Sequence, residues 1–431
     1  MRILFIHQNF PGQFKHLAPA LAAQGHEVVA LGINKPEFAT PGVKVLLHRP
    51  RVHNPESLKD VPVELRELHA KTTRGHSVAR TLLRLKQEAF VPDLICAHSG
   101  WGEAFFVKDV FPHIPLLVYA EYYYGTEDGD TYFDPEFSKW SIEGMERLRI
   151  KNTHLLQSLM AADYGLSPTH FQRDRHPGLL RQKIKVIHDG IDTRVFIPNP
   201  NASVSIKSIG ITLRPENEVV TFVARELEPY RGYHQFMRAL PQLMALRPNA
   251  QFIVVGGSGV SYGAAPPEGS TWKDLFYKEV ASRIDRTRLH FVGRVPHDVL
   301  TQLLQVSTVH VYLTYPFVLS WSLMEAMSIG CLIVGSRTSP VEEVIKHGRT
   351  GLLVDFFNPA EIAQTVAEAL DQREQLAPLR LAARKHIVKH YDLKTQCLPA
   401  QLKLVQSLAQ KSRKPLAKSG DNPEIVMGKR N

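Results

Sequence analysis

Cysteine is scarce in this sequence, and long apolar runs are absent. The three cysteines, Cys96, Cys331 and Cys397, are odd in number and far apart in a chain of 431 residues. Two of them stand in apolar runs, where buried free thiols are common, so the sequence indicates neither a disulfide framework nor a metal site. No run approaches the roughly 20 apolar residues that span a bilayer, and MRILFIHQNF lacks a small-residue cleavage site. We therefore expect a cytoplasmic protein.

Acidic residues are outnumbered by basic ones. The chain has 52 Lys and Arg against 42 Asp and Glu, a formal net charge of +10, which favours anionic partners without singling out nucleic acid, and we expect no nucleic-acid partner. Part of the excess lies in residues 411–431, whose Lys, Ser, Pro and Gly content predicts a disordered basic tail. Another part lies in residues 64–86 at helical spacing. A solvated helix face explains it, and so does peripheral contact with anionic lipid headgroups.

Apolar runs alternate with helical patterns along both halves, which predicts an α/β fold with parallel sheets covered by helices. The strands predicted in the first half are 3–6, 26–31, 43–48, a run within 92–100, 115–120, a short run at 164–169, and a run within 183–193 that ends in a turn. Those predicted in the second half are 219–224, 251–255, 289–292, 309–313 and 331–335. Helices are predicted at 13–24, 102–110 and 141–162.

A stretch rich in Asn, Pro, Ser and Lys at 198–216 separates the two sets of elements. We predict an N-terminal Rossmann-like domain at 1–190, a C-terminal Rossmann-like domain at 191–390, and a helix at 391–410 that packs back on the N-terminal domain. Two doubly wound domains that face each other form a cleft at the carboxyl ends of their strands, where such sheets bind ligands. The sequence sets no oligomeric state.

The segment 314–354 is the most informative part of the chain. An apolar run, VHVYL, ends in a loop, and a helix begins near Leu319 and Ser320. Backbone N–H groups at a helix start lack intrahelical partners and commonly bind phosphate. Glu325 lies one turn further on among Leu, Met, Ala and Ser. We interpret it as the acceptor for vicinal hydroxyls of a bound ribose, although a buried helix with one satisfied carboxylate explains it equally.

Several motifs occur in the order found in retaining glycosyltransferases of family 4, which have the GT-B fold of two facing Rossmann-like domains. HDGIDT resembles the family's interdomain loop, and the resemblance places its Gly190 among the donor-binding residues. VARELEPYRGYHQFMRAL resembles the segment in which an Arg and, six residues on, a Lys bind the donor diphosphate; these are Arg225 and Arg231 here. FVGRVPHDVL resembles the segment that reads the nucleotide base through groups near Gly293 and Arg294.

The resemblance covers about residues 1–405. It implies retaining transfer of a sugar from a nucleoside diphosphate sugar, held by the second domain, to a hydroxyl of a carbohydrate or lipid-linked acceptor on the first. Arg225 and Arg231 suit this chemistry because guanidinium groups stabilise a diphosphate leaving group without a metal. Salt bridges with Glu226 or Glu228 are the alternative. We expect no obligatory cofactor or metal, with the nucleotide sugar as co-substrate.

One position departs from the family pattern of a Glu, seven residues and a second Glu. The second Glu is Glu325, but Phe317 stands in place of the first. Either the donor sugar is held differently, by backbone groups of Val318, Leu319 and Ser320, or the protein is a catalytically degenerate nucleotide-sugar sensor or scaffold. We expect activity, because the arginines and Glu325 are retained.

Three residues of the first half are candidates for the reacting centre. Gly12 precedes a helix and leaves room for a ligand at its start, although a plain turn explains it too. His98 follows a strand within AHSGWGE, where a structural histidine is the alternative. Glu121 follows the next strand, where the family commonly has a His, and it would orient the acceptor hydroxyl or stabilise an oxocarbenium-like centre. A loop carboxylate paired with an Arg explains Glu121 equally.

Aromatic residues surround these candidates. Trp101, Tyr122 and Tyr123 are predicted either to stack on an acceptor sugar or to pack between the domains. Nearby, Asp128 and Asp130 form the Asp-any-Asp pattern that binds metal in the other major glycosyltransferase fold, but their position in a polar loop indicates turn chemistry instead. The glycines after residue 255 do not complete a dinucleotide fingerprint, so an NAD-dependent oxidoreductase is not supported.

Overall fold

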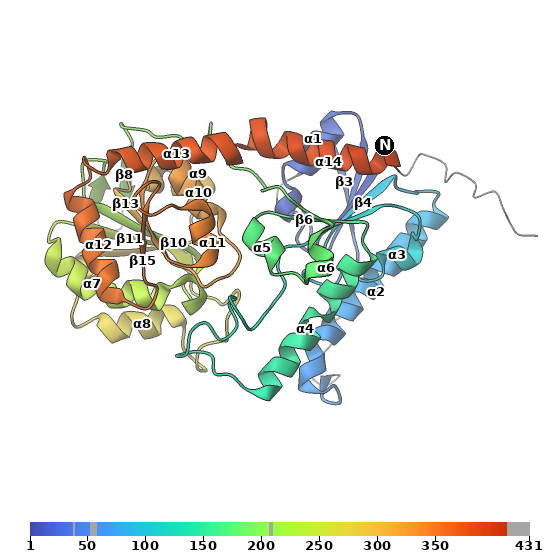
Figure 1. Ribbon diagram of the computed structural model, residues 1–431, viewed down its shortest axis with the longest axis horizontal. Helices are drawn as coiled ribbons and strands as arrows, with labels where there is room; N and C mark the ends of the chain where they lie inside the picture. The colour runs from blue at the N-terminus through green and yellow to red at the C-terminus, as the bar shows by residue number, and fades with distance from the viewer. Residues whose placement is uncertain (38, 52–57, 207–209, 412–431) are drawn as a thin grey trace, which may run out of the picture.

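The computed structural model describes residues 1–37, 39–51, 58–206 and 210–411. Two α/β domains lie side by side, and helices α13 and α14 run along one edge of both (Figure 1). The predicted basic tail lies, apart from residue 411, outside the described residues. Two facing doubly wound domains confirm the predicted fold class, while the domain limits stay predictions.

The first sheet has seven parallel strands in the order β3-β2-β1-β4-β5-β6-β7. Its strands are β1 Arg2–Ile6, β2 Glu27–Gly32, β3 Val43–Leu47, β4 Leu94–His98, β5 Leu116–Tyr119, β6 Tyr164–Ser167 and β7 Ile184–Val186. Along β1, Ile3 and Phe5 pack in one apolar cluster, and Leu4 and Ile6 in another. Successive side chains of a strand point to opposite faces, so both faces of this sheet are covered, as its continuous apolar runs predict.

The second sheet has six parallel strands in the order β12-β11-β10-β13-β14-β15. Its strands are β10 Val219–Glu226, β11 Gln251–Gly257, β12 Leu289–Gly293, β13 Val309–Tyr312, β14 Leu332–Ser336 and β15 Leu352–Val354. The strand order reverses direction between β1 and β4 in the first sheet and between β10 and β13 in the second. Ligands of such sheets bind at the carboxyl ends of these strands.

Fourteen α-helices are found in the described residues. They are α1 Leu17–Ala23, α2 Arg66–Gln87, α3 Val107–Val110, α4 Ile142–Ala161, α5 His170–Asp174, α6 Gly178–Arg181, α7 Tyr233–Leu246, α8 Trp272–Val280, α9 His297–Gln305, α10 Trp321–Ile329, α11 Ser339–Val344, α12 Pro359–Asp371, α13 Ala377–Tyr391 and α14 Leu398–Lys411. Within the described ranges, none of them combines the length and the hydropathy that crossing a membrane requires.

The chain passes between the domains near residue 191 and again near residue 392, and the two passages are hydrogen-bonded to each other. The backbone N–H of Ile191 donates to the Tyr391 carbonyl, and that of Leu393 donates to the Ile191 carbonyl. Beyond this point α14 contacts α1 and β4, and its residues Val405 and Leu408 are buried in the apolar cluster of the first domain. The last helix therefore lies on the domain in which the chain began.

One local prediction is wrong, and one predicted linker contains additional structure. The helix predicted at 102–110 is only α3, because turns occupy residues up to 106. Gly102 has φ +97°, and a Cβ there would overlap the Lys71 carbonyl of α2, so close packing rather than helical periodicity sets this segment. The stretch 198–216 also contains an antiparallel hairpin of β8 Val204–Ile206 and β9 Ile211–Leu213.

Candidate active site

A cavity of about 580 Å³ lies between the carboxyl ends of the two sheets. Nine residues predicted from the sequence line it: Gly12, Trp101, Glu121, Arg225, Arg231, Val318, Leu319, Ser320 and Glu325. They come from the ends or following loops of β1, β4, β5, β10 and β13, or from the nearby start of α10. Strands on either side of both reversal points therefore contribute, which places predicted residues from both halves around one space.

The two arginines line this cavity in different states. Arg231 is buried, and its guanidinium Nη1 donates to Thr314 Oγ1 at 3.0 Å and to the Val318 carbonyl at 2.9 Å. Arg225 is exposed at the end of β10, and no hydrogen bond or ion pair joins its side chain to a described residue. The cavity thus has one fixed guanidinium and one that is free to meet a ligand.

The salt-bridge alternative for the arginines is not found in the structure. Glu226 pairs with Arg294 and accepts the Gly259 N–H at 2.7 Å. Glu228 is buried and accepts backbone N–H groups of residues 261–263, each at 3.3 Å. The carboxylates nearest in sequence to the arginine pair are therefore occupied elsewhere.

Gly190, Gly293 and Arg294 are not among the described residues that line the cavity. Gly190 packs against Leu393, beside the passages between the domains. Gly293 ends β12, and the exposed Arg294 next to it is held by Glu226. Their predicted part in donor binding stays a prediction.

Glu325 lies on α10 with 4 % of its surface exposed. It accepts a hydrogen bond from His297 Nε2 at 3.2 Å, and His297 also lines the cavity. At the start of α10, the Ser320 N–H donates to the Tyr312 hydroxyl at 2.9 Å, and the Ser320 hydroxyl caps the Ser322 N–H. Two of the backbone N–H groups that the sequence offers for phosphate thus have partners inside the protein.

A hydrogen-bonded chain of side chains supports Glu121 on the first-domain side. Gln13 Nε2 donates to Glu121 Oε1 at 2.8 Å, and Gln13 Oε1 lies 2.7 Å from His7 Nε2. His98 is fully buried, does not line the cavity among described residues, and places its Nε2 3.7 Å from Glu121 Oε2. Burial raises the pKa of Glu121, but His98 first and then the hydrogen bond from Gln13 outweigh it and hold the pKa below its usual value. Glu121 is therefore charged at neutral pH.

His7 and Gln13 are site residues that the sequence interpretation missed. Both line the cavity, and burial, followed by the nearby His98, lowers the pKa of His7 to about 3, so His7 is neutral. A Cβ at Gly12, which has φ +47°, would overlap the His7 ring, so this glycine allows the loop to close over the histidine. The signal that could have found them is HQNFPGQF, directly after the first strand of a doubly wound sheet.

Phe317 belongs to an aromatic contact between the domains. It is 4 % exposed, and its ring centroid lies 4.7 Å from that of Tyr122, 5.5 Å from Tyr230 and 5.0 Å from Tyr262. The Tyr122 hydroxyl donates to the Pro316 carbonyl at 2.9 Å. The position at which the family pattern has a carboxylate is thus filled by apolar packing.

The remaining aromatic candidates lie in different surroundings. Trp101 lines the cavity and packs on His7 and His98. Tyr122 takes part in the contact with Phe317, and Tyr123 lies 5.8 Å from the His176 ring. Neither tyrosine is among the described cavity residues. Their predicted contact with an acceptor stays a prediction.

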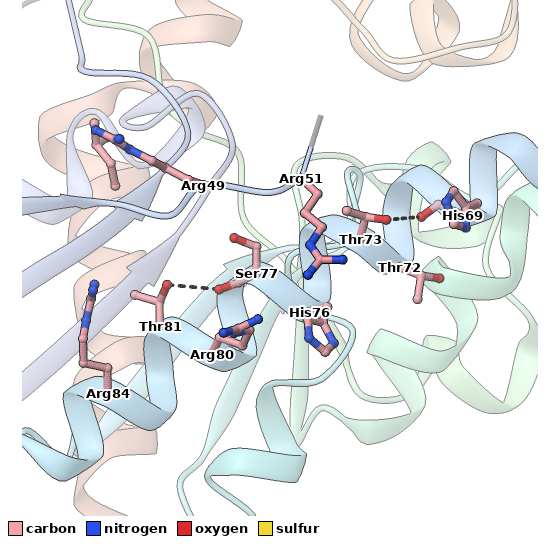
Figure 2. A pocket seen from close by; sticks show the side chains of 11 residues that line it. Arg49, Arg51, His69, Thr72, Thr73, His76, Ser77, Arg80, Thr81 and Arg84 are labelled. Carbon is pink, nitrogen blue, oxygen red and sulfur yellow. Dashed lines mark hydrogen bonds between the residues drawn. The ribbon is translucent and has the colours of Figure 1, made fainter. Parts of the chain in front are cut away.

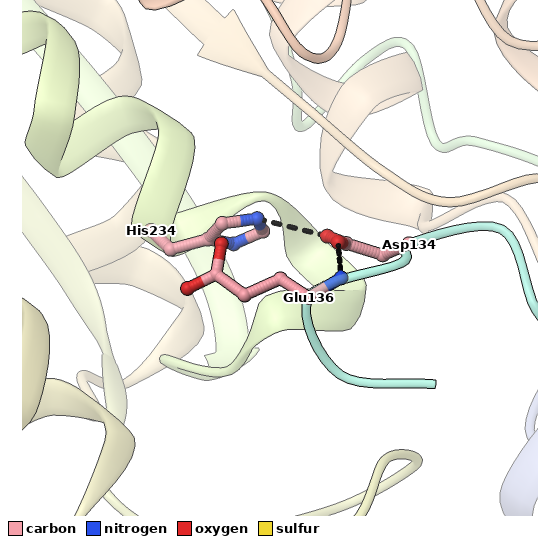
Figure 3. Close-up of side chains that lie close together, drawn as sticks. All are labelled: Asp134, Glu136 and His234. Atoms are coloured by element: carbon pink, nitrogen blue, oxygen red, sulfur yellow. Dashed lines mark hydrogen bonds and ion pairs between the residues drawn. The ribbon is translucent and has the colours of Figure 1, made fainter. Parts of the chain in front are cut away.

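Asp134, Glu136 and His234 place potential ligand atoms within 4.8 Å of one another, the arrangement of a metal site (Figure 3). Each carboxylate already has protein partners, however. His234 Nε2 lies 3.0 Å from Asp134 Oδ2, and the Tyr315 hydroxyl donates to the same oxygen at 2.9 Å. Arg238 donates to both oxygens of Glu136 at 2.7 and 2.8 Å. The group therefore attaches the loop after β5 to α7.

The Asp-any-Asp pattern of Asp128 and Asp130 lies in the same loop. Asp130 is buried and accepts hydrogen bonds from the hydroxyls of Tyr122 and Tyr230 at 3.0 and 2.8 Å. Burial raises the pKa of Asp130. The Asp-any-Asp pattern therefore belongs to a loop of the first domain. This loop contacts the second domain through Asp130, Asp134 and Glu136.

Two doubly wound domains around a ligand-sized cleft define the protein class as one with the GT-B fold. Solved structures share this architecture. HepE from Anabaena, in complex with UDP and glucose, has a TM-score of 0.64 at 17 % identity and covers 94 % of this chain and 100 % of its own. Sucrose-phosphate synthase from Thermosynechococcus elongatus has a TM-score of 0.69 at 17 % identity, with 95 % and 100 % covered. At this identity the likeness concerns the fold.

Sequence comparison gives the family. The model described as Glycosyl transferase family 4 group matches residues 24–196, and the one described as Glycosyl transferases group 1 matches residues 205–386. The chain therefore belongs to glycosyltransferase family 4.

Curated relatives agree with this assignment. D-inositol 3-phosphate glycosyltransferase of Corynebacterium efficiens is 28 % identical over 194 residues, 44 % of each chain. Glycogen synthase of Mycobacterium tuberculosis is 24 % identical over 434 residues, 92 % of each. The chain spans about half the length of the first curated relatives that it matches.

Proposed function

We propose that this protein transfers a sugar from a nucleoside diphosphate sugar to a hydroxyl acceptor, with retention of configuration and without an obligatory metal. One observation carries the proposal: Arg225, Arg231 and Glu325 line the same cavity as Glu121, although they come from different domains. Membership of the glycosyltransferase family supports the reaction class.

The second domain would hold the donor. Arg231 uses Nη1 for Thr314 and Val318, so its remaining N–H groups are available to a diphosphate. A guanidinium already fixed by the protein loses little freedom when charge develops on the leaving group, which is the basis of electrostatic stabilisation. Arg225 would supply a second positive charge, and the Glu325 carboxylate would accept hydrogen bonds from the ribose hydroxyls.

The first domain would present the acceptor. Glu121 is charged and held by Gln13 and His98, so it can orient an acceptor hydroxyl or stabilise positive charge at the anomeric carbon. In a front-face reaction, the bond from the anomeric carbon to the phosphate oxygen breaks while the bond to the acceptor oxygen forms. The acceptor proton passes to the leaving phosphate, so no separate base is needed.

The similar proteins suggest which donors and acceptors to test first. HepE was solved with UDP, which supports testing uridine donors first, and relatives named glycogen synthase and D-inositol 3-phosphate glycosyltransferase support a polyhydroxylated acceptor. A polysaccharide or glycolipid precursor fits the same chemistry.

Phe317 supports a second candidate function. Its position is filled by packing against Tyr122, Tyr230 and Tyr262, so a side chain that the family pattern uses for the donor sugar is replaced. A nucleotide-sugar-binding sensor or scaffold would keep the arginines and lack turnover.

Thermal stabilisation by UDP-, GDP- and ADP-sugars tests the donor site, because a ligand that binds only the folded state raises its melting temperature. We expect Arg225→Ala to abolish the shift and Arg214→Ala, an exposed arginine of the same domain outside the cavity, to preserve it. An unchanged response in Arg225→Ala overturns the donor assignment. Sugar transfer or donor hydrolysis supports the enzyme, whereas donor binding without either supports the scaffold.

A further inference from the structure

A second cavity, of about 890 Å³, lies in the first domain between α2 and the segment that follows β3 (Figure 2). It shares no lining residue with the cleft between the domains. Its lining residues are Leu47, Arg49, Arg51, His69, Thr72, Thr73, His76, Ser77, Arg80, Thr81 and Arg84. They include four arginines and two histidines, and no described Asp or Glu lines the cavity.

Both walls of the cavity are basic. The spacing of three or four residues places one set on a single face of α2: His69, Thr73, His76, Arg80 and Arg84. Arg49 and Arg51 lie on the opposite wall, and Figure 2 shows Arg51 extending toward His76 and Arg80. The edge strand and the helix thus direct their positive groups into one space.

Within the part of the chain that the structure describes, no carboxylate neutralises the four guanidinium groups. No hydrogen bond or ion pair joins the side chains of Arg49, Arg51, Arg80 and Arg84 to any residue in the described ranges, and all four are exposed. Arg238, by contrast, pairs with the carboxylates of Glu136 and Glu279. Like charges that gather without a counter-charge repel, so an anionic ligand would stabilise this cavity.

Two threonine hydroxyl groups of the cavity are already used as donors within the protein. Thr72 and Thr81 donate to the carbonyls of Leu68 and Ser77 within α2, at 2.8 and 3.0 Å. The guanidinium groups, which have no partner among the described residues, carry forked N–H pairs that match the oxygens of phosphate.

We propose that this cavity binds a phosphate-bearing group, a phosphomonoester or a diphosphate, at a site apart from the cleft between the domains. Two sources present this chemistry: a soluble phosphorylated compound and the headgroup of an anionic lipid. Leu83, which is 49 % exposed on the same helix, would suit the lipid source. The site is independent of the proposed sugar transfer and does not rest on it.

Chemical protection tests the site residue by residue. Phenylglyoxal modifies accessible guanidinium groups, and mass spectrometry of peptides separates Arg80 and Arg84 from Arg225 in the cleft. We expect inorganic pyrophosphate to protect Arg80 and Arg84 at least about tenfold more than sodium chloride of equal ionic strength, and this protection to be lost in Arg49→Gln/Arg51→Gln. Equal protection by both salts, or protection of Arg225 alone, overturns the proposal.

Flotation with vesicles identifies the source of the phosphate. Phosphatidylcholine vesicles with and without phosphatidic acid are compared for the parent and for Arg80→Gln/Arg84→Gln, with Arg283→Gln/Arg286→Gln in the second domain as the control of equal charge. Binding to phosphatidic acid vesicles that falls at least about tenfold only in the first variant supports a lipid headgroup. Pyrophosphate protection without flotation supports a soluble ligand. Equal flotation of both variants, with no pyrophosphate protection, overturns a specific site.

Discussion

Trp321 donates its indole N–H to Asp189 Oδ2 at 3.0 Å and so joins the start of α10 to the loop after β7. The Tyr119 hydroxyl donates to both oxygens of the same carboxylate. Burial raises the pKa of Asp189 from 3.8 to about 6. Because the folded-state pKa lies above the ordinary one, protonation favours the folded state, and this contribution is lost as the pH rises from 3.8 to about 6.

Trp321→Phe removes one donor to this carboxylate. At pH 8, where Asp189 is charged, we expect the free energy of unfolding to fall by about 1.5–3 kcal/mol, as for a hydrogen bond to a charged group. At pH 5 the loss should be smaller, because a protonated carboxyl group accepts more weakly. Urea unfolding at both pH values measures the difference, and Trp140→Phe, at a tryptophan that is 67 % exposed, is the control. An equal loss at both pH values would contradict the role of Asp189.

Arg231→Lys should weaken binding of nucleoside diphosphates more than Arg225→Lys does. Both changes keep the charge, but only Arg231 is buried and fixed by two hydrogen bonds, which a lysine cannot reproduce. We expect about a tenfold to hundredfold loss for Arg231→Lys, as when one charge-assisted contact is lost. Isothermal titration calorimetry with UDP measures it. Similar losses in the two variants would mean that charge alone matters at this site.

Phe317→Glu tests whether the aromatic contact has replaced the sugar-binding carboxylate of the family pattern. The new carboxylate would lie among the rings of Tyr122, Tyr230 and Tyr262, so we expect it to destabilise the fold by several kcal/mol, on the order of an unpaired buried charge. Phe317→Leu, which removes only the ring, should cost about 1–3 kcal/mol. Thermal unfolding and sugar transfer are measured for both variants. A stable Phe317→Glu protein with faster transfer would contradict this interpretation.

Glu103→Gln should stabilise the protein at neutral pH. Glu103 is fully buried, neither of its carboxylate oxygens has a hydrogen-bond partner, and His48 Nε2 is 4.0 Å away. Burial raises the pKa of Glu103 above the ordinary 4.5, so the folded state loses stability as the pH rises above 4.5, and glutamine avoids this loss. The melting temperatures of Glu103→Gln and of the parent should be equal at pH 4 and differ at pH 7, where the variant should melt at the higher temperature. Glu146→Gln, at an exposed position on α4, should change neither.

The strands that set the fold were predictable because each is specified by a run of consecutive apolar residues. Runs such as 3–6 and 219–224 are long enough to specify buried parallel strands. Ligands of such sheets bind at the carboxyl ends of the strands, and Glu121 and Arg225 stand at such ends, one in each sheet, where they line one cavity. The partners of these residues were not predictable. Gln13 bonds Glu121 across 108 residues of sequence, and Tyr122 bonds Pro316 across 194. Such contacts depend on how loops and domains pack, which no local pattern records.

The paired passages of the chain near Ile191 and Asp392 determine how the domains can move. Because the two passages are hydrogen-bonded to each other, a change in the angle between the domains would bend both passages together. Bending at these passages would rotate one domain away from the other and widen the cleft between them. The hydrogen bond between Asp134 and His234 also joins the two domains, so a wider opening of the cleft would have to break this bond or carry the Asp134 loop along with the second domain.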